Sequence, residues 1–445
     1  MTLASCSPNA KFVNTTHFDF APTVSSMSTA EPFYHKPLPL SAVRYNLRAI
    51  SAFGIFGFAN TVLPHIIFSG LYLIIPFPRP IVLVIELLPA LAIELLFPHA
   101  LHYVPHWACP VFVASCWILA TITTNASPPN VVAPIRILIA ILASASTAAG
   151  KVFFSSQLSL YGKTALAGWG TGIAAGSALR DILPTLLTLY TNMVLRDCIK
   201  YTYCLLLATV AAYFLILPSP LIQYELENLA AEGELTPEIE EQKLSLLSEE
   251  IPSSDMSFGV RFNRNMHLLG SKLFRLCINP LLLVTAVQVL VSPGTTRASA
   301  ILPIFPRYSA FSAAHDFAFQ YGNLLARSTA LLFRTRRLRL IFALLVFCTT
   351  AAILNTAFLL TSNVYFLFGV LFTIGWLGGM MYMGIFGAAM DYLGRNPEAD
   401  AEFALGSIGI GETAGILIGS LAGVTFDTQL CGLAKRSGRW CSTLP

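Results

Sequence analysis

Charged residues are scarce in this sequence. Asp, Glu, Lys and Arg make up only 11% of its 445 residues, whereas 55% are hydrophobic. A soluble domain carries about 25% charged residues, so this chain has too little polar surface to cover a water-soluble globule of its size. We therefore expect lipid to surround most of the chain. The net charge of +4 is small and gives no reason to expect a nucleic-acid partner.

The sequence also lacks the signatures of common enzyme and metal sites. "YGKT" (161–164) resembles the end of a phosphate-binding loop, but Gln157 stands where that motif needs its first glycine. There is no HExxH, GxSxG or CxxC motif, so we expect a non-enzymatic protein without metal or cofactor. The first 40 residues contain no long apolar run, and we expect the first span, not a cleavable signal peptide, to direct insertion.

Long apolar runs predict eleven membrane spans, six before a polar gap and five after it. They lie at 49–75, 80–101, 106–124, 132–154, 164–190, 199–217, 274–293, 310–333, 338–361, 364–390 and 403–426. The expected fold is an all-α polytopic membrane protein, a helical bundle in two halves. The expected parts are a cytosolic polar tail (1–47), a six-span half (48–217), a cytosolic acidic and basic loop (218–273), a five-span half (274–427) and a lumenal tail (428–445).

Lys and Arg near the span ends predict the orientation. With a cytosolic N-terminus, more of these cations fall on the inner side, most densely in "RTRRLR" (334–339). The glycosylation sequon that begins at Asn125 then lies on the outer side. An odd number of spans puts the C-terminus in the lumen, where an oxidising environment would let Cys431 pair with Cys441. Two free thiols are the alternative.

Three spans carry glycines at intervals of four residues, which places them on one helix face. They are Gly168, Gly172 and Gly176 in the fifth span, Gly375 and Gly379 in the tenth, and Gly411, Gly415 and Gly419 in the eleventh. In lipid, helices associate where small residues let their backbones approach, so we expect these faces to pack against other helices. The matching positions of the fifth and eleventh spans favour a major-facilitator-like helical bundle in two pseudo-repeated halves, related by a parallel internal repeat, with the glycine faces as surfaces on which the halves rock. The alternative is that glycine is simply common in membrane helices.

Polar side chains form stripes along two spans. The eighth span carries Asp316, Gln320, Asn323 and Arg327, and the fourth carries Ser144, Thr147, Lys151 and Ser155. Because ionisable groups are costly at mid-membrane, we expect both stripes to face a shared water-filled cavity between the halves, with interhelical salt bridges as the alternative. Asn60, Glu86, Glu94 and Glu412 lie in other spans. The candidate pathway residues are Arg327, Asn323, Gln320, Asp316, Lys151, Thr147, Glu86, Asn60 and Glu412.

Several stretches match a known pattern in order. They are "SLYGKTALAGWGTGIAAG" (159–176), "FQYGNLLARST" (319–329), "WLGGMMYMGIF" (376–386) and "AEFALGSIGIGETAGI" (401–416). Together they resemble the battenin family, the lysosomal and vacuolar membrane proteins linked to juvenile neuronal ceroid lipofuscinosis, over roughly residues 50–432. The resemblance implies a vacuolar or lysosomal membrane, a role in luminal pH homeostasis, and transport of basic amino acids or glycerophosphodiesters.

The chain departs from the family pattern at three intramembrane acids. Lys151, Gln288 and Ile374 stand where the resemblance implies glutamates in the fourth, seventh and tenth spans. Carboxylates are the usual proton carriers in such sites, so their loss weakens the case for proton coupling. Lys151 and Arg327 would instead give a net positive cavity that favours anionic groups.

Two functions remain open from the sequence. In the first, the protein is an alternating-access transporter in which Arg327 binds an anionic solute with help from Gln320 and Asn323. Glu86 and Glu412 would then exchange protons or balance the cations. In the second, it is a non-transporting scaffold or trafficking regulator, and the acidic segment 224–255 docks trafficking adaptors.

Overall fold

Helices account for nearly all of the chain that the structure describes. In this computed structural model the described residues are 40–72, 78–105, 107–126, 133–190, 201–218, 220, 258–296, 308–330, 337–361, 363–396, 399–437 and 441, and no strand occurs among them. Three features predicted from the sequence lie outside these residues: the polar tail up to residue 39, Ser127 of the sequon, and the acidic segment 224–255. Residues from Ser41 onward form one compact unit.

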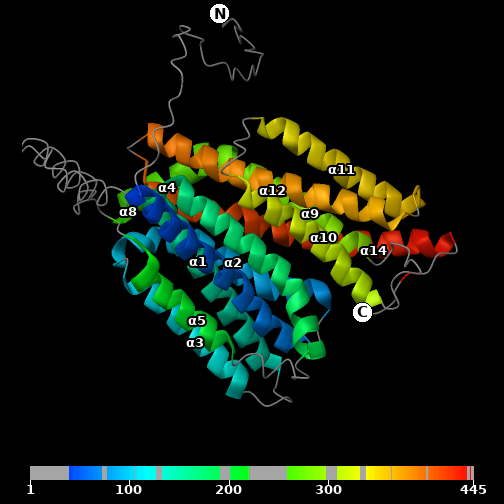
Figure 1. The fold of residues 1–445 in the computed structure, drawn as a ribbon, viewed down its shortest axis with the longest axis horizontal. Helices are drawn as coiled ribbons and strands as arrows, with labels where there is room; N and C mark the ends of the chain where they lie inside the picture. Colours follow the sequence, from blue (N-terminus) through cyan, green and yellow to red (C-terminus); the bar gives the residue numbers. More distant parts are fainter. Residues whose placement is uncertain are drawn as a thin grey trace, which may run out of the picture. The chain divides into compact units, whose positions relative to one another are not determined.

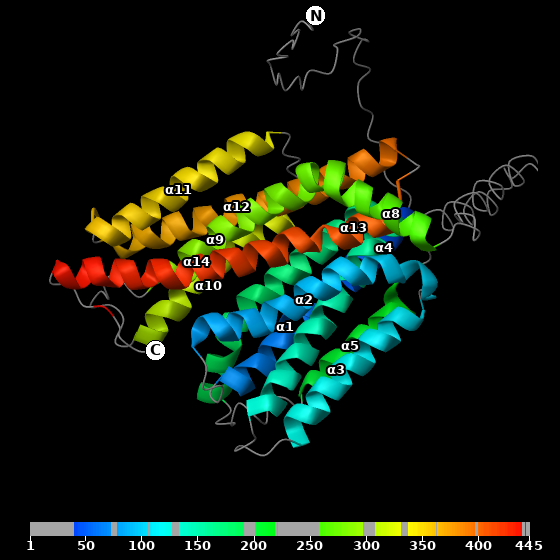
Figure 2. The same ribbon diagram turned by 180° about the vertical axis from the view of Figure 1, so that it is seen from behind.

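The helices of this unit form two groups that follow chain order, as Figures 1 and 2 show from opposite sides. The N-terminal half contains α1 (Leu40–Tyr72), α2 (Arg79–Ala100), η1 (Leu101–Tyr103), α3 (Ala108–Ala126), α4 (Ala133–Tyr190), α5 (Tyr201–Ala211) and the π-helical η3 (Ala212–Ile216). The C-terminal half contains α8 (Phe258–Leu268), the π-helical η4 (Leu269–Ile278), α9 (Asn279–Thr296), α10 (Tyr308–Ser328), α11 (Leu338–Phe358), α12 (Val364–Arg395), α13 (Ala401–Ser407) and α14 (Gly409–Arg436).

Each predicted span coincides with a helical segment. Among the described residues, 7 helices are long and apolar enough to cross a membrane, and two shorter apolar helices lie at 108–124 and 203–216. One of the long helices, α4, contains both the fourth and the fifth predicted span. The amphipathic α10 is not one of the seven. The all-helical membrane fold is confirmed, whereas the count of eleven stays a prediction.

The chain reverses within α4 at Gly162, whose φ of 75° lies in the left-handed region that glycine tolerates. Contacts with α1 show the reversal. The close pairs are Phe56–Phe154 and Phe53–Tyr161 before the break, and Ile50–Gly168 and Gly54–Gly172 after it. The first part of α4 therefore runs antiparallel to α1 and the second part runs parallel to it, so Gly162 separates two spans.

The glycine faces pack helices together inside each half. A Cβ added at Gly172 would overlap the backbone of Gly54 on α1, and one at Gly415 would meet the backbone of Leu282 on α9. Gly168, Gly176 and Gly419 make equivalent contacts on the same two helix pairs, and Gly411 meets the backbone of Ile278 at the end of η4. Gly375 and Gly379 face α10. The prediction that these faces let the two halves rock on each other is wrong, because each face is buried against a helix of its own half.

The same parallel pairs occur in both halves. The second part of α4 lies along α1, and α14 lies along α9 in the same sense. Likewise α2 runs parallel to the first part of α4, and α10 runs parallel to α12. Counted as predicted spans, the first half pairs span 1 with span 5 and span 2 with span 4. The second half pairs span 7 with span 11 and span 8 with span 10, which is the same pattern six spans later. This correspondence supports the predicted parallel repeat, which weak sequence similarity alone could not establish.

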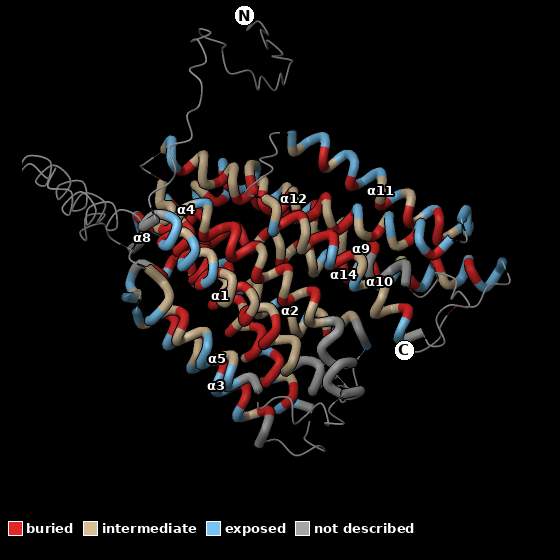
Figure 3. The backbone as a smooth tube through the Cα atoms, viewed as in Figure 1, coloured by how far each residue is buried: buried red, intermediate tan, exposed pale blue. Residues whose placement is uncertain are grey.

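Apolar side chains cover much of the outer surface of the bundle. Figure 3 shows buried residues concentrated where α1, α4, α10 and α12 pack, and exposed residues along α3, α5 and α11. The exposed side chains include Leu207, Leu215, Phe347 and Phe358, each at least 70% accessible. A surface of this kind is stable in lipid and would aggregate in water.

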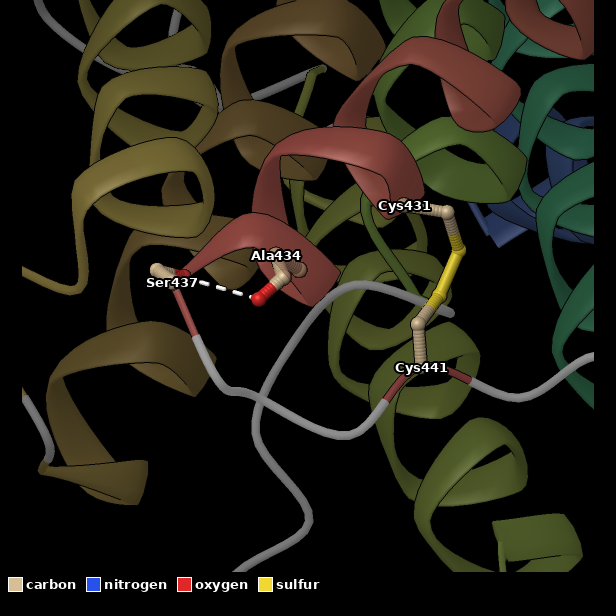
Figure 4. The surroundings of a disulfide bond; sticks show 4 residues. All are labelled: Cys431, Ala434, Ser437 and Cys441. Atoms are coloured by element: carbon tan, nitrogen blue, oxygen red, sulfur yellow. Dashed lines mark hydrogen bonds between the residues drawn. A yellow bond between two sulfur atoms is a disulfide. The ribbon is translucent and has the colours of Figure 1, made fainter.

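Two boundaries differ from those predicted. Residues 258–273, predicted as part of a loop, are helical and continue through η4 into α9 without a break. α14 extends to Arg436, well past the predicted end at 426. Cys431 near the end of α14 forms a disulfide with Cys441 beyond it, with the Cα atoms 5.7 Å apart, and the Ser437 hydroxyl donates a hydrogen bond to the Ala434 carbonyl (Figure 4). The structure therefore shows the disulfide and not two free thiols.

Close packing at Gly172 predicts a stability difference between two glycine-to-alanine variants. Gly172→Ala forces α1 and α4 apart and should cost roughly 1–3 kcal/mol, so its melting temperature in detergent should fall. Gly369 on α12 is the matched control, because an added Cβ there meets no atom within 4 Å. Gly369→Ala should be neutral or gain about 0.5–1 kcal/mol from better helix propensity. Equal melting temperatures for the two variants would contradict the packing role of Gly172.

Candidate functional site

A buried lysine connects the two halves. The Lys151 Nζ atom on α4 lies 3.2 Å from Oε1 of Glu94 on α2 and 2.7 Å from Oε2 of Glu412 on α14. Thr413 Oγ1 donates a hydrogen bond of 2.8 Å to Glu94 Oε1 and accepts one of 3.3 Å from Lys151. These four residues are called the Lys151 cluster. One carboxylate comes from the lysine's own half and one from the other half.

A glycine makes room for this cluster. Gly409 begins α14, and a Cβ there would lie 3.1 Å from Lys151 Cε and 3.4 Å from Glu94 Cδ. Its carbonyl oxygen lies 3.5 Å from Lys151 Nζ, as a further acceptor. The side chains of Glu94, Lys151 and Glu412 are 1%, 14% and 16% exposed. At such burial the attraction between the charges is strong, and so is the penalty for removing only one of them.

A second cation lies beside an aromatic ring of the C-terminal half. Arg327 on α10 is 6% exposed, and its Cζ atom lies 3.8 Å from the centre of the Tyr382 ring on α12. Its Nε atom donates a hydrogen bond of 2.9 Å to Asn323 Oδ1, one helical turn back. Trp169 on α4 reaches Tyr382 from the N-terminal half. This arrangement is a cation–π contact, which keeps the guanidinium in place without neutralising it.

The two groups of charges belong to one polar region. Tyr382 interacts electrostatically with Lys151, Glu412 and Arg327, and Glu412 also interacts with Arg327. The region between the halves therefore contains two cations and two carboxylates. The net positive cavity predicted from Lys151 and Arg327 is wrong, because Glu94 and Glu412 balance the two positive charges.

Further contacts join the halves at the same end of the bundle. Lys163, next to the reversal in α4, forms a 2.9 Å ion pair with Asp391 near the end of α12. The His99 ring lies 4.6 Å from the Phe262 ring and 4.8 Å from the Phe403 ring, centre to centre. Gly406 of α13 packs on Val152 of α4. The end of the bundle that contains α13 and the reversal at Gly162 is thus held together by ionic and apolar contacts.

The stripe on α10 divides between different surroundings. Arg327 and Asn323 lie together, but Asn323 also packs against Gly379 of α12. Gln320 is 9% exposed. Asp316 is 31% exposed and lies 3.2 Å from the ring of its neighbour His315. The stripe therefore does not face a single water-filled cavity. Its C-terminal members pack between helices, Asn323 against α12 and Arg327 near Gly170 of α4.

The stripe on α4 is mostly satisfied by backbone groups. Ser144 donates a hydrogen bond to the Glu86 carbonyl, Thr147 to the Ala143 carbonyl and Ser155 to the Val152 carbonyl. Lys151 is the member of this stripe that contacts the other half. Ser144 and Lys151 therefore form the interhelical bonds considered as the alternative, whereas Thr147 and Ser155 bond to carbonyls of α4 itself.

Two residues predicted for the pathway lie apart from the Lys151 cluster. Glu86 lies opposite Ser144, while Glu94, two turns further along α2, is the acid that pairs with Lys151. Asn60 packs against Gly150 and lines a mainly apolar cavity of the N-terminal half between α1, α3, α4 and α5.

Sequence reasoning missed Trp169, Tyr382 and Thr413 as members of this region. Aromatic residues are frequent in membrane helices, so Tyr382 within "GGMMYMG" gives no signal before its contact with Arg327 is seen. Two of the departures from the family pattern also meet. The Gln288 side chain donates a 3.4 Å hydrogen bond to the Ile374 carbonyl, although the positions are 86 residues apart.

Comparison with known proteins identifies the family. A family model described as "CLN3 protein" matches residues 51–433. The chain belongs to the CLN3, or battenin, family. Protein btn1 of Aspergillus fumigatus is 27% identical over 419 residues, covering 88% of this chain and 90% of the relative. Protein btn-1 of Neurospora crassa is 26% identical over 428 residues, with the same coverage. The battenin resemblance found in the sequence is thereby confirmed.

Solved structures show which fold this CLN3-family chain adopts. FucP, a major facilitator superfamily transporter in the outward conformation, matches with a TM-score of 0.54 and covers 89% of this chain and 99% of FucP. Sequence identity is 14%, so the likeness shows the fold alone. The predicted major-facilitator-like fold is confirmed. CLN3 membership and this fold together make the protein a transporter-like, multi-pass membrane protein.

Removing one charge of the Lys151 cluster should destabilise the protein much more than removing all three. Lys151→Met leaves two buried carboxylates without a cation and should destabilise the protein by roughly 3–5 kcal/mol. The triple variant Glu94→Gln/Lys151→Met/Glu412→Gln should recover much of that loss, because no uncompensated charge remains. Thermal unfolding in detergent measures both changes. Lys163→Met is the control, because its exposed pair with Asp391 contributes about 0–1 kcal/mol. A triple variant less stable than Lys151→Met would contradict the assignment.

Proposed function

We propose that this protein transports a small solute across a vacuolar or lysosomal membrane by alternating access. In such a mechanism the two halves close one side of a central site while the other side opens. The Lys151 cluster supports this proposal most directly, because it joins the halves through ionic and hydrogen-bonding contacts that water can replace. The glycine contacts inside each half supply the complementary property, since each half can move as a rigid body.

The disulfide supports an assignment for the closed side. Glu412 and Cys431 are separated by roughly 28 Å along α14 at 1.5 Å per residue, close to the thickness of a hydrocarbon core. Disulfides persist in oxidising compartments and are rare in the cytosol. We therefore place Cys431 and Cys441 in the lumen and the Lys151 cluster toward the cytosol, as the positive-inside pattern predicts. The conformation described here is then closed on its cytosolic side.

The candidate cargo comes from two sources. The battenin resemblance implies basic amino acids or small anionic metabolites such as glycerophosphodiesters, together with a role in luminal pH homeostasis. Both cargo classes contain an anionic group that Arg327 would bind. Protons remain candidate coupling ions, because Glu94 and Glu412 supply intramembrane carboxylates despite the lost family glutamates. The adaptor-docking alternative depends on residues 224–255, which lie outside the described part of the chain.

A reversible cross-link tests alternating access directly. A Cβ added at Gly406 would lie 3.6 Å from Ser156 Cβ across the two halves, within the range that a disulfide spans. In vesicles reconstituted with Ser156→Cys/Gly406→Cys protein, oxidation should abolish uptake of labelled arginine or glycerophosphocholine, and a reductant should restore it. The single variants Ser156→Cys and Gly406→Cys are controls for the native cysteines and should be insensitive to oxidation. Undiminished uptake in the fully cross-linked double variant would refute the mechanism.

A further inference from the structure

Three hydrogen-bond donors converge between the halves without a protein acceptor. They belong to Arg327 on α10, Tyr382 on α12 and Trp169 on α4, whose side chains are 6%, 2% and 0% exposed. Arg327 lies against the Tyr382 ring, and Trp169 reaches the same tyrosine from the other half. Trp169 Nε1 is directed toward the Tyr382 hydroxyl, but by distance and angle neither of these atoms, nor Arg327 Nη1, completes a hydrogen bond with another described residue. Burying three unsatisfied donors side by side is costly, so their arrangement points to a ligand.

The chemistry of these donors restricts the ligand class. A guanidinium and an indole N–H can only donate hydrogen bonds, and a phenol donates readily to an anion. Lys151 is already held by two carboxylates, whereas no carboxylate forms a salt bridge with Arg327 in the described part of the chain. Arg327 Nε donates to the neutral Asn323 oxygen, and the guanidinium lies against an aromatic face. Glu412 acts on it electrostatically without forming a salt bridge among the described residues. A ligand rich in acceptors and negatively charged would complete this environment.

We propose that Arg327, Tyr382 and Trp169 form a binding site for one anionic group, a phosphate ester or a carboxylate. Arg327 supplies the charge, and Tyr382 and Trp169 supply directed hydrogen bonds that select oxyanion geometry. These two aromatic residues replace Gln320 and Asn323, which the sequence favoured as helpers of Arg327. Asn323 instead holds Nε of Arg327, which leaves Nη1 for the ligand.

The site is assembled from both halves. Trp169 belongs to the N-terminal half, while Arg327 and Tyr382 belong to the C-terminal half. The contact of Gly170 with Met383 and Arg327 shows that the halves meet here. The site is therefore complete when the end held by the Lys151 cluster is closed, and separation of the halves removes the Trp169 donor. That the bound anion is transported cargo rests on the proposed function, whereas the binding itself does not.

Ligand binding by the purified full-length protein tests the site. Glycerophosphocholine probes the phosphodiester class, acetate probes the carboxylate class, and glycerol is the uncharged control. We expect saturable thermal stabilisation by at least one of the two anions and none by glycerol. Arg327→Gln should abolish this binding, and Tyr382→Phe and Trp169→Phe should each weaken it about tenfold, as expected for one hydrogen bond to a charged group. Tyr365→Phe on the exposed face of α12 is the matched control and should bind normally.

Each outcome separates the binding site from transport. Binding that survives Tyr382→Phe and Trp169→Phe at wild-type affinity, or stabilisation by glycerol equal to that by the anions, would overturn the site. Oxidised Ser156→Cys/Gly406→Cys protein should still bind the anion, because the cross-link keeps the halves closed, and lost binding there would also count against the site. If the binding pattern is as expected but no solute enters vesicles, the site stands and the transport proposal fails. If the Tyr382→Phe and Trp169→Phe variants both bind the anion and take up solute like wild type, the transport proposal stands and the binding site fails.

Discussion

The need to neutralise charge inside a membrane explains the arrangement between the two halves. Lys151 cannot remain ionised in a hydrocarbon environment without nearby acids, and the structure supplies one from α2 and one from α14. Because one partner lies on the other half, satisfying this cation also holds the halves together. Separation of the halves requires the same charges to be solvated, so water entry and domain motion are two aspects of one event.

The bundle uses a different kind of contact within each half. Glycines bring α1 and α4 together, and α9 and α14, until their backbones touch. Such contacts depend on shape and lose their dispersion energy as soon as the helices separate, with no compensating hydration. Polar contacts between the halves, in contrast, exchange protein partners for water. The distribution of the two contact types accordingly divides the chain into rigid parts and a boundary that can open.

Hydropathy and glycine spacing predicted most of the fold, since both report on local periodicity. The helix positions, the break between the fourth and fifth spans and the close-packing faces all follow from residues near one another in sequence. The partners of those faces did not follow, because Gly172 gives no sign that it meets α1 and not a helix of the other half. The charged region was predicted in part for the same reason. Lys151, Arg327 and Glu412 are conspicuous in apolar spans, but the choice of Glu94 over Glu86 and the roles of Trp169 and Tyr382 depend on tertiary packing.

The continuous helix from α8 through η4 to α9 has a mechanical consequence. Its N-terminal part carries the exposed cations Arg264, Lys272 and Arg275 together with exposed apolar side chains such as Phe262 and Phe274, a composition suited to the headgroup layer of a bilayer. An unbroken helix acts as a lever, so any tilt of α9 inside the membrane sweeps this basic segment across the lipid surface. Anionic lipids that bind the segment would therefore resist or favour the tilt. If the protein works by the proposed alternating access, the lipid composition of that leaflet would influence how often the two halves change their arrangement.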